Sequence, residues 1–269
     1  MPRWSITAVD NNGALDAALE SETNAVLLTL ANASETVESL RAVAAAAAPR
    51  VRERNKQALV TVNHPRTRLL RDDIGALPIA LLDGVLLPHA VEPQDVRDLA
   101  VVLREFELSN GVEPGSVAIL PVIDTARGLL RAAEIAAAAP RVAGLVFDSG
   151  AYAADVGARD ESRGERLAYA RGFVVAAAHA ADGEPVVRGG DLELPYLAQC
   201  GFAGAIVSNA TAAAAANAAF GPLPADKDRA RRIVEAYDAA HTGGDWVGRS
   251  GTVIADAHAA RAARRLLGE

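Results

Sequence analysis

The sequence predicts an α/β fold, a TIM-type (β/α)8 barrel with an additional C-terminal helical arm. Short β-branched runs alternate along the chain with long stretches rich in Ala, Leu, Arg and Glu, as expected for parallel strands joined by crossover helices. Most of these runs are followed by a helical segment, which favours a closed barrel over an open sheet. The length of 269 residues suits a single barrel, which typically takes about 250 residues.

The expected strands are, in chain order, Trp4–Thr7, Ala25–Leu30, Ala58–Asn63, Gly84–Leu87, Val117–Ile123, Val142–Phe147, Pro185–Arg188 and Gly204–Val207. Beyond them, helices are expected at Asp226–Ala240 and Ala255–Leu267, on either side of the Gly-rich segment His241–Gly251. We therefore assign residues 1–222 to the barrel. Residues 223–269 form the arm, which either belongs to the same domain or caps a neighbouring subunit.

Composition and charge exclude several classes of function. The net charge of −7 argues against nucleic acids and anionic membranes as partners, because both attract basic surfaces. A single cysteine, Cys200, excludes a disulfide framework and a cysteine-based metal cluster. No apolar run reaches the roughly 18–20 residues of a membrane span, and the N-terminus lacks the pattern of a signal peptide. A cytoplasmic protein is therefore expected.

In a barrel of this type, function is expected where the strands end at their carboxyl side. The polar residues at these ends are Thr7, Asp10, Thr29, Asn32, Asn63, His64, His89, Asp124, Asp148, Arg188, Ser208 and Asn209. Only Asp10, Asp124 and Asp148 among them are carboxylates. A hard cation such as Mg²⁺ prefers oxygen ligands and usually takes one or two carboxylates together with water or substrate oxygens. The sequence thus predicts a barrel mouth with few charged residues, in which Asp124 is the leading candidate for a metal ligand.

Several segments carry a resemblance to the citrate lyase β-subunit branch of the HpcH/HpaI aldolase superfamily. Leu120–Ile135 resembles the family's fifth strand, in which an acidic residue precedes Thr-Ala-Arg-Gly. Asp83–Val96 resembles its Asp-Gly-hydrophobic-Leu-Pro-Lys segment, and Pro140–Gly157 resembles the next strand and loop. Asp226–Ala240 and Ala259–Leu267 resemble its C-terminal helices. The resemblance therefore runs nearly from end to end.

The resemblance implies a barrel that binds Mg²⁺ and acts on an acyl-CoA or a 2-oxoacid by making or breaking a carbon–carbon bond. In that chemistry the metal polarises a carbonyl and stabilises the enolate, while an arginine assists the developing negative charge. The partners implied are a small carboxylate or an acyl-CoA. The resemblance also implies a homo-oligomer, a trimer or hexamer, in which the arm covers a neighbour's barrel mouth.

The sequence departs from the family where the chemistry is expected. Thr61 stands in place of the catalytic arginine, and His89 in place of the lysine after Leu-Pro. Asp124 replaces the glutamate that is the first metal ligand, and Ala151 replaces the aspartate that is the second. Further departures are Ile6–Asp10, Thr29–Asn32, Val207–Ser208 and Ala255. Several such losses together are expected to abolish the ancestral reaction.

The candidate site residues follow from the strand ends and the resemblance together. The candidate catalytic residues are Asn63, Arg127 and Asp148. The candidate substrate-binding residues are Thr7, Thr61, His89 and Ser208. The candidate metal ligands are Asp124 and Asp148, with Asp148 as a substitute for the ligand lost at Ala151.

Each of these residues also has a structural interpretation. Asp124 could instead be a residual carboxylate at a helix N-terminus, and Arg127 could bond across the barrel mouth. His89 lies in a loop where a solvated histidine is common. The turn that begins at Arg188 and continues through two glycines could bind an anion or simply connect two elements.

Two functional hypotheses therefore stand. The first is a divergent carbon–carbon lyase that still uses Mg²⁺ as its cofactor but catalyses an altered reaction. The second is a non-catalytic paralogue that keeps the barrel for binding or assembly. We favour loss or alteration of the ancestral lyase activity, because only one of the two implied metal ligands is a carboxylate in its expected place. Whether the chain is an enzyme is left open by its sequence.

Overall fold

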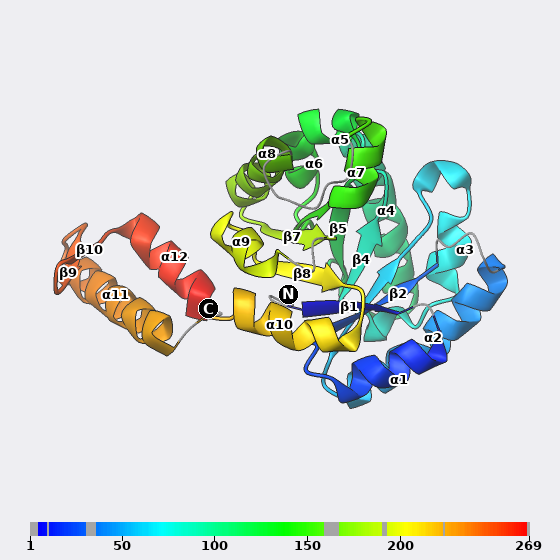
Figure 1. Ribbon diagram of the computed structural model, residues 1–269, viewed down its shortest axis with the longest axis horizontal. Coiled ribbons are helices and arrows are strands. Elements are labelled where there is room, and N and C mark those ends of the chain that lie inside the picture. Colours follow the sequence, from blue (N-terminus) through cyan, green and yellow to red (C-terminus); the bar gives the residue numbers. More distant parts are fainter. Residues whose placement is uncertain are drawn as a thin grey trace. The chain divides into compact units, whose positions relative to one another are not determined.

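A computed structural model describes residues 5–9, 11–30, 36–158, 167–189, 193–222 and 224–267. Its contacts divide the chain into two compact units, Met1–Phe220 and Gly221–Glu269. The first unit is a closed barrel of eight parallel strands in chain order, which confirms the predicted fold class (Figure 1). The assignment of residues 1–222 to a barrel, and of residues 223–269 to an arm that either belongs to the same domain or caps a neighbouring subunit, stays a prediction.

The barrel strands lie close to the positions that the sequence predicts. They are β1 (Ser5–Val9), β2 (Ala25–Thr29), β3 (Gln57–Thr61), β4 (Gly84–Leu87), β5 (Ala118–Ile123), β6 (Gly144–Asp148), β7 (Glu184–Arg188) and β8 (Gly204–Val207). Each strand is parallel to its neighbours, and β1 pairs with β8 to close the sheet. The ends of the strands therefore form one continuous mouth at the carboxyl side.

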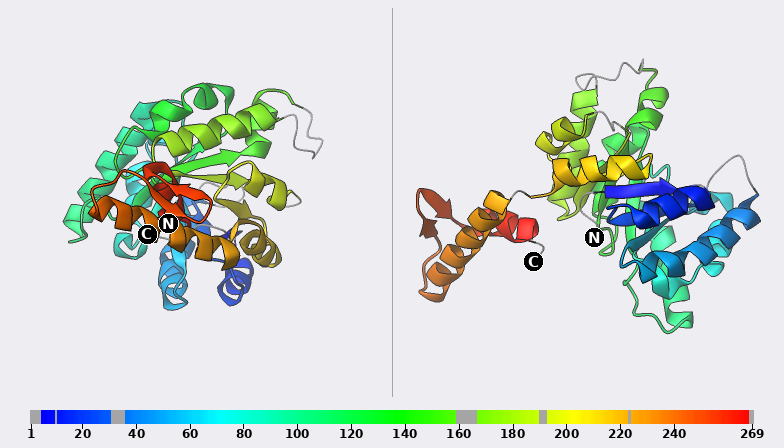
Figure 2. Two further views of the ribbon diagram at one scale, coloured as in Figure 1. Left: turned by 90° about the vertical axis from the view of Figure 1, so that its left-hand side faces the viewer. Right: turned by 60° about the horizontal axis from the view of Figure 1, so that its bottom comes forward.

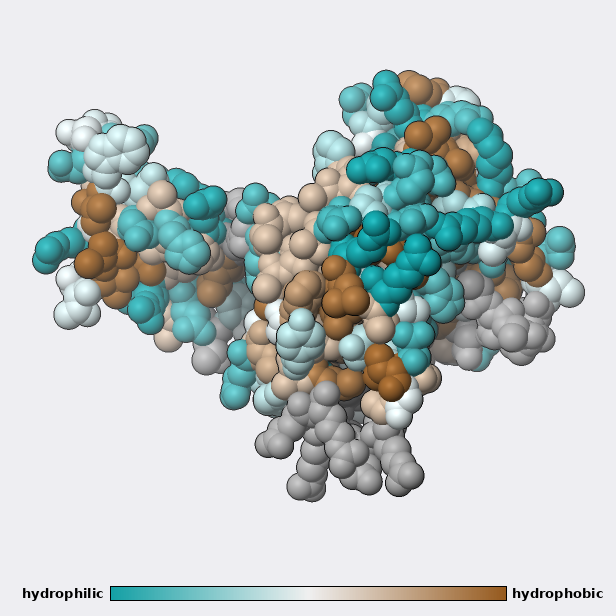
Figure 3. Space-filling model, turned by 90° about the horizontal axis from the view of Figure 1, so that it is seen from above, coloured by the Kyte–Doolittle hydropathy of each residue, from teal (hydrophilic) through white to brown (hydrophobic). Residues whose placement is uncertain are grey.

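Helices and short 3₁₀ helices connect the strands and surround them (Figure 2). They are α1 (Asn12–Glu20), α2 (Val37–Glu53), η1 (Pro65–Thr67), α3 (Leu70–Gly75), η2 (Ile79–Leu81), α4 (Pro93–Ser109), α5 (Ala126–Leu130), α6 (Ala132–Ala136), α7 (Ser149–Asp155), α8 (Ala168–Ala180), α9 (Leu194–Gln199) and α10 (Ala210–Phe220). The surface seen in Figure 3 mixes hydrophilic side chains with small apolar groups, which is usual for a folded domain.

Strand residues alternate between the barrel interior and the layer of helices, as they do in any small barrel. The interior is one buried apolar cluster formed by Ile6, Ala25, Leu27, Leu59, Leu86, Leu120, Val122, Val146, Val186 and Ile206. The residues between them, such as Val60 and Phe147, pack against the helices. This alternation decides which side chains at the strand ends point into the mouth.

The Thr-Ala-Arg-Gly segment shows how the sequence sets a helix close to the mouth. Thr125 caps α5, because its hydroxyl accepts a hydrogen bond from the backbone N–H of Gly128 at 3.1 Å. A side chain at Gly128 would place its Cβ only 2.5 Å from the carbonyl oxygen of Ala90. Glycine therefore lets α5 approach the loop after β4, which carries His89.

The second unit consists of α11 (Pro224–Thr242), the strands β9 (Gly248–Ser250) and β10 (Val253–Ala255), and α12 (Ala257–Leu267). Both helices match those expected from the sequence. The antiparallel pairing of β9 with β10 was not predicted, because three-residue strands are too short to show an alternating pattern. Gly251, with φ of 62°, lies in the turn between them. None of the helices in the described parts of the chain is long and apolar enough to cross a bilayer.

Candidate functional site

Six side chains point into the barrel mouth from the ends of the described strands. Each follows an interior apolar residue by two positions, so the alternation of the strand turns it inward. They are Thr29, Thr61, Asp124, Asp148, Arg188 and Ser208. The last four come from β5 to β8, which are neighbours in the barrel, so the charged residues gather on one side of the mouth. The expected rim residues Asp10 and Asn32 lie outside the described residues.

Asp124 is the most buried acid of the mouth, with 4% of its surface exposed. Its Oδ2 accepts a hydrogen bond from the backbone N–H of His89 at 3.1 Å and lies 2.9 Å from Nδ1 of the same residue. His89 reaches this position because its φ of 52° turns both groups toward β5. The other oxygen, Oδ1, is buried and has no hydrogen-bond partner among the described residues.

Burial raises the pKa of Asp124 above its ordinary value, and the nearby charge of Asp148 raises it further. The positive charge of His89 and its backbone N–H oppose this shift, because both stabilise the ionised carboxylate. The burial effect is the largest of these. Asp124 is therefore an acid held in an unfavourable place, which is typical of functional sites more than of structural ones.

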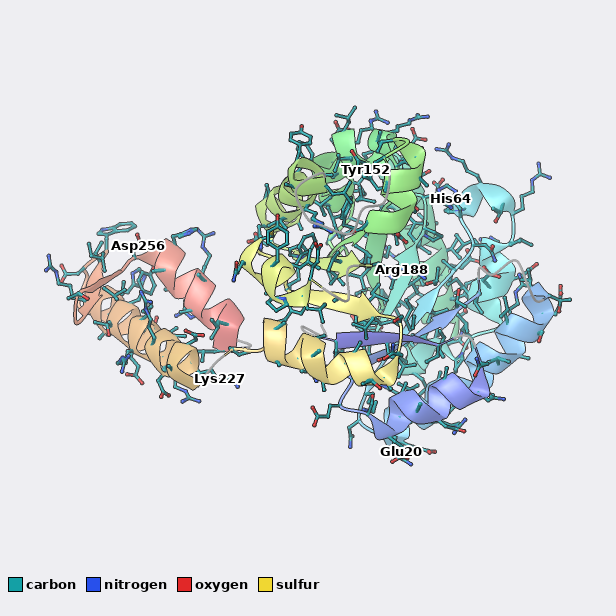
Figure 4. All side chains as sticks on the ribbon, viewed as in Figure 1. Glu20, His64, Tyr152, Arg188, Lys227 and Asp256 are labelled. Carbon is teal, nitrogen blue, oxygen red and sulfur yellow. The ribbon has the colours of Figure 1, made fainter. Side chains whose placement is uncertain are left out.

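Asp148 ends β6 and begins α7. Its Oδ1 accepts a hydrogen bond from the backbone N–H of Ala151 at 3.0 Å and so caps the helix. Its Oδ2 lies 3.7 Å from Nε of Arg188, the residue beside it on β7. In the view of Figure 4, Arg188 lies over the middle of the barrel, between Tyr152 and Glu20. An acid and a guanidinium thus face each other across two neighbouring strand ends.

Asn63, a candidate catalytic residue, is held by a buried acid of α3. Its backbone N–H and its side-chain Nδ2 both donate to Oδ2 of Asp73, at 2.8 and 2.9 Å. Asp73 is fully buried, and its Oδ1 pairs with Arg41 at 2.7 Å. The amide nitrogen of Asn63 is thereby committed to positioning the loop after β3. Its role toward a substrate stays a prediction.

The structure separates the four candidate substrate-binding residues. Thr61 and Ser208 point into the mouth and His89 lies beside it, bound to Asp124. Thr7 does not join them, because it lies between the interior residues Ile6 and Ala8 and therefore faces the helices. Its hydroxyl donates to that of Thr23 at 2.9 Å, at the amino end of β2. The predicted strand ended at Thr7, whereas β1 continues to Val9.

Arg127 also lies apart from the mouth residues. Its side chain is 65% exposed, and Nη2 lies 3.6 Å from Oε2 of Glu92, which precedes α4. Arg66 and Arg131 contact the same glutamate. Arg127 therefore belongs to a group of charged residues on the loops around Glu92, and this contact differs from the bond across the barrel mouth that the structural interpretation expects.

The sequence analysis missed the residues that hold these groups in place. Asp73 and Glu92 each organise several partners, although neither was singled out. A signal existed for Glu92, since Pro93 follows it and Asp95 completes a capping box at the start of α4. No local pattern distinguishes Asp73 from its exposed neighbour Asp72.

The donor atoms present do not fit the two-carboxylate Mg²⁺ site that the resemblance implies. One oxygen of Asp124 is engaged by His89, and one oxygen of Asp148 caps α7. Ala151, at the place of the second ligand, has no donor atom in its side chain. Across the described parts of the chain, no three His, Cys, Asp or Glu side chains converge as a metal ion would require.

The buried carboxylate makes stability depend on pH. The pKa of Asp124 in the folded chain is raised above its ordinary value near 3.8. Protonated Asp124 therefore stabilises the fold below pH 3.8, and this contribution is lost as the pH rises through the raised pKa. We expect Asp124→Asn to increase the free energy of unfolding by about 1 kcal/mol at about pH 7, and by less at about pH 4. Urea unfolding at the two pH values measures this difference.

The exposed Asp98→Asn variant is the control and should show no such pH-dependent gain. A variant Asp124→Asn that is less stable than the unaltered chain at both pH values would show that the contact with His89 outweighs the cost of burial.

Comparison with known proteins adds a family to this geometry. The model of the HpcH/HpaI aldolase/citrate lyase family matches residues 8–216. Citrate lyase subunit beta from Escherichia coli K12 is 29% identical over 196 residues, which cover 70% of this chain and 65% of that protein. The chain thus matches slightly less than two thirds of that relative's length. The (3S)-malyl-CoA thioesterase of Cereibacter sphaeroides ATCC 17023 is 29% identical over 222 residues, 77% of this chain and 72% of the relative.

A solved structure shares the fold. It is the protein CitE from Mycobacterium tuberculosis in complex with magnesium, acetoacetate and coenzyme A. The TM-score is 0.62 and the sequence identity 19%, over 100% of this chain and 99% of the other.

Proposed function

We propose a function from the premise that the chain belongs to the HpcH/HpaI aldolase/citrate lyase family, whose model matches residues 8–216. The barrel binds a small carboxylate or an acyl-CoA at the carboxyl ends of its strands. The family's metal-assisted cleavage of a carbon–carbon bond has been lost or altered.

One observation carries this proposal: the charges that the mouth presents are already balanced by the protein. Asp124 faces His89, and Asp148 faces Arg188. At the end of β3, where the resemblance implies an arginine, the inward side chain is that of Thr61. Breaking a carbon–carbon bond beside a carbonyl builds negative charge on oxygen, and losing one preorganised group that stabilises such charge costs about 2.7–4 kcal/mol.

The ligand class is supported by what related proteins are named for. One relative is a (3S)-malyl-CoA thioesterase, and the CitE structure holds acetoacetate and coenzyme A. The magnesium in that structure supports Mg²⁺ as a plausible cofactor in the family. For this chain, Mg²⁺ binding through Asp124 and Asp148 is the expectation from the resemblance, and the proposal does not include it, because one oxygen of each carboxylate is already engaged by the protein.

The alternative is a non-catalytic paralogue that serves as a binding or assembly subunit. The same balanced charges favour this alternative over an active lyase. It differs from the proposed function in whether a small ligand enters the mouth. A trimeric or hexameric assembly and a cytoplasmic location are further predictions that come from the family resemblance.

Ligand-observed NMR with pyruvate, oxaloacetate and acetyl-CoA separates the two functions. We expect saturation transfer from the protein to at least one of them, and we expect the signal to fall when Ser208, which points into the mouth, is replaced by Trp. Transfer to none of these ligands would contradict a ligand-binding mouth. A defined oligomer in analytical ultracentrifugation would then favour the assembly function.

A further inference from the structure

We propose that Arg188 is the residue that binds the carboxylate of the mouth ligand, and that this binding needs no divalent ion. The inference rests on the proposed function, since it requires that a carboxylate enters the mouth. It adds the residue that receives the ligand and the chemical class of group that the residue selects.

The position of Arg188 follows from the fold. It is the last residue of β7, two positions after Val186 of the interior cluster. In the register of the sheet it lies between Asp148 of β6 and Ile206 of β8. Gly189 follows with φ of 81°, in the left-handed region that glycine adopts readily. The side chain is thus carried by a rigid strand and not by a loop.

The guanidinium is accessible as well as oriented. Its side chain is 43% exposed, although it starts from a strand whose interior neighbours are buried. Among the described residues, Arg188 pairs with Asp148, whose Oδ2 lies 3.7 Å from Nε, beyond hydrogen-bond distance. The two terminal nitrogens form the flat edge that matches a carboxylate in a bidentate pair.

Other cations near the mouth are committed elsewhere. His89 is bound to Asp124 through Nδ1. Arg127 and Arg131 both contact Glu92 on the loops. Among the six inward-facing residues at the described strand ends, Arg188 is the one cation, while Thr61 at β3 is uncharged. The inward-facing cation at the described strand ends therefore lies on β7, and not on β3, where the resemblance implies an arginine.

Asp148 gives the inference a distinctive signature. If a metal ion recruited the ligand, Asp148 would help to hold the ion, and Asp148→Asn would weaken binding. If Arg188 recruits the ligand, Asp148 competes with it for the guanidinium, and Asp148→Asn should keep binding or tighten it. Asparagine caps a helix as well as aspartate does, so the variant retains the start of α7.

Calorimetric titration of the full chain with pyruvate and with oxaloacetate, in EDTA and separately in Mg²⁺, tests the inference. We expect binding in EDTA that Arg188→Gln weakens by about tenfold or more and that Arg188→Lys partly restores. The matched control is Arg52→Gln. Arg52 is 41% exposed and pairs with Asp83 at 2.9 Å, at the amino end of β4, so its loss should leave affinity unchanged.

Binding that appears only with Mg²⁺, or that Asp148→Asn weakens, would overturn the inference while leaving the proposed function standing. So would an Arg188→Gln variant that binds as tightly as the unaltered chain. No binding by the unaltered chain in either condition contradicts the proposed function itself, and the inference with it. Circular dichroism and thermal unfolding of each variant establish that it is folded.

Discussion

Replacing Asp73 by alanine is expected to lower the free energy of unfolding by about 3–5 kcal/mol. Its side chain is fully buried and accepts from Arg41 through Oδ1 and from two nitrogens of Asn63 through Oδ2. The variant leaves the guanidinium of Arg41, which is 13% exposed, without its counter-charge, and leaves two donors of Asn63 unsatisfied. Urea unfolding at neutral pH measures the loss.

The neighbouring acid provides the control. Asp72 lies on the same turn of α3 but is exposed, so Asp72→Ala should change stability by no more than about 0.5 kcal/mol. If Asp73→Ala lowered the free energy of unfolding as little as Asp72→Ala, the contacts of Asp73 with Arg41 and Asn63 would not stabilise the loop after β3 as inferred.

Restoring an acid at Ala151 is expected to create a Mg²⁺ site. The residue lies in the first turn of α7, and its N–H is bonded to Asp148, so a carboxylate there would lie near that of Asp148. Asp124 and Asp148 follow Ile123 and Phe147, which are paired between β5 and β6, so the two acids lie at neighbouring strand ends. Three carboxylates repel one another without a cation and bind a hard cation readily.

Saturating Mg²⁺ should therefore raise the melting temperature of Ala151→Asp by roughly 5–10 °C, with little effect on the unaltered chain. Ala154→Asp is the matched control, since Ala154 lies on the same helix but is exposed. An equal rise in the unaltered chain would mean that Asp124 and Asp148 already hold the ion.

The sequence predicted the barrel well because its signals are local. Each strand is a short apolar run followed by a polar end, and the strand ends of a parallel barrel must meet at one mouth. Asp124, Asp148, Thr61 and Ser208 were thereby placed correctly at the carboxyl ends. The sequence analysis did not use the alternation of side chains along β1, in which Thr7 lies between the interior residues Ile6 and Ala8 and therefore faces the helices.

The contacts of the site could not be predicted in the same way. The pairing of Asp73 with Arg41 joins residues 32 positions apart, and it depends on how α3 packs. The contact between His89 and Asp124 depends on a left-handed backbone conformation that histidine adopts less readily than glycine. Such contacts arise from tertiary packing, so no pattern of neighbouring residues in the sequence predicts them.

The central claim is that the charges of this mouth are balanced by protein side chains, and that the family's metal-assisted cleavage has been lost or altered. The most direct test is to incubate the unaltered chain with (3S)-malyl-CoA and Mg²⁺ and to follow the formation of acetyl-CoA and glyoxylate. We expect no cleavage above the rate without protein. Mg²⁺-dependent turnover at a rate typical of enzymes, about 1 s⁻¹ or more, that Asp124→Ala abolishes would contradict the claim.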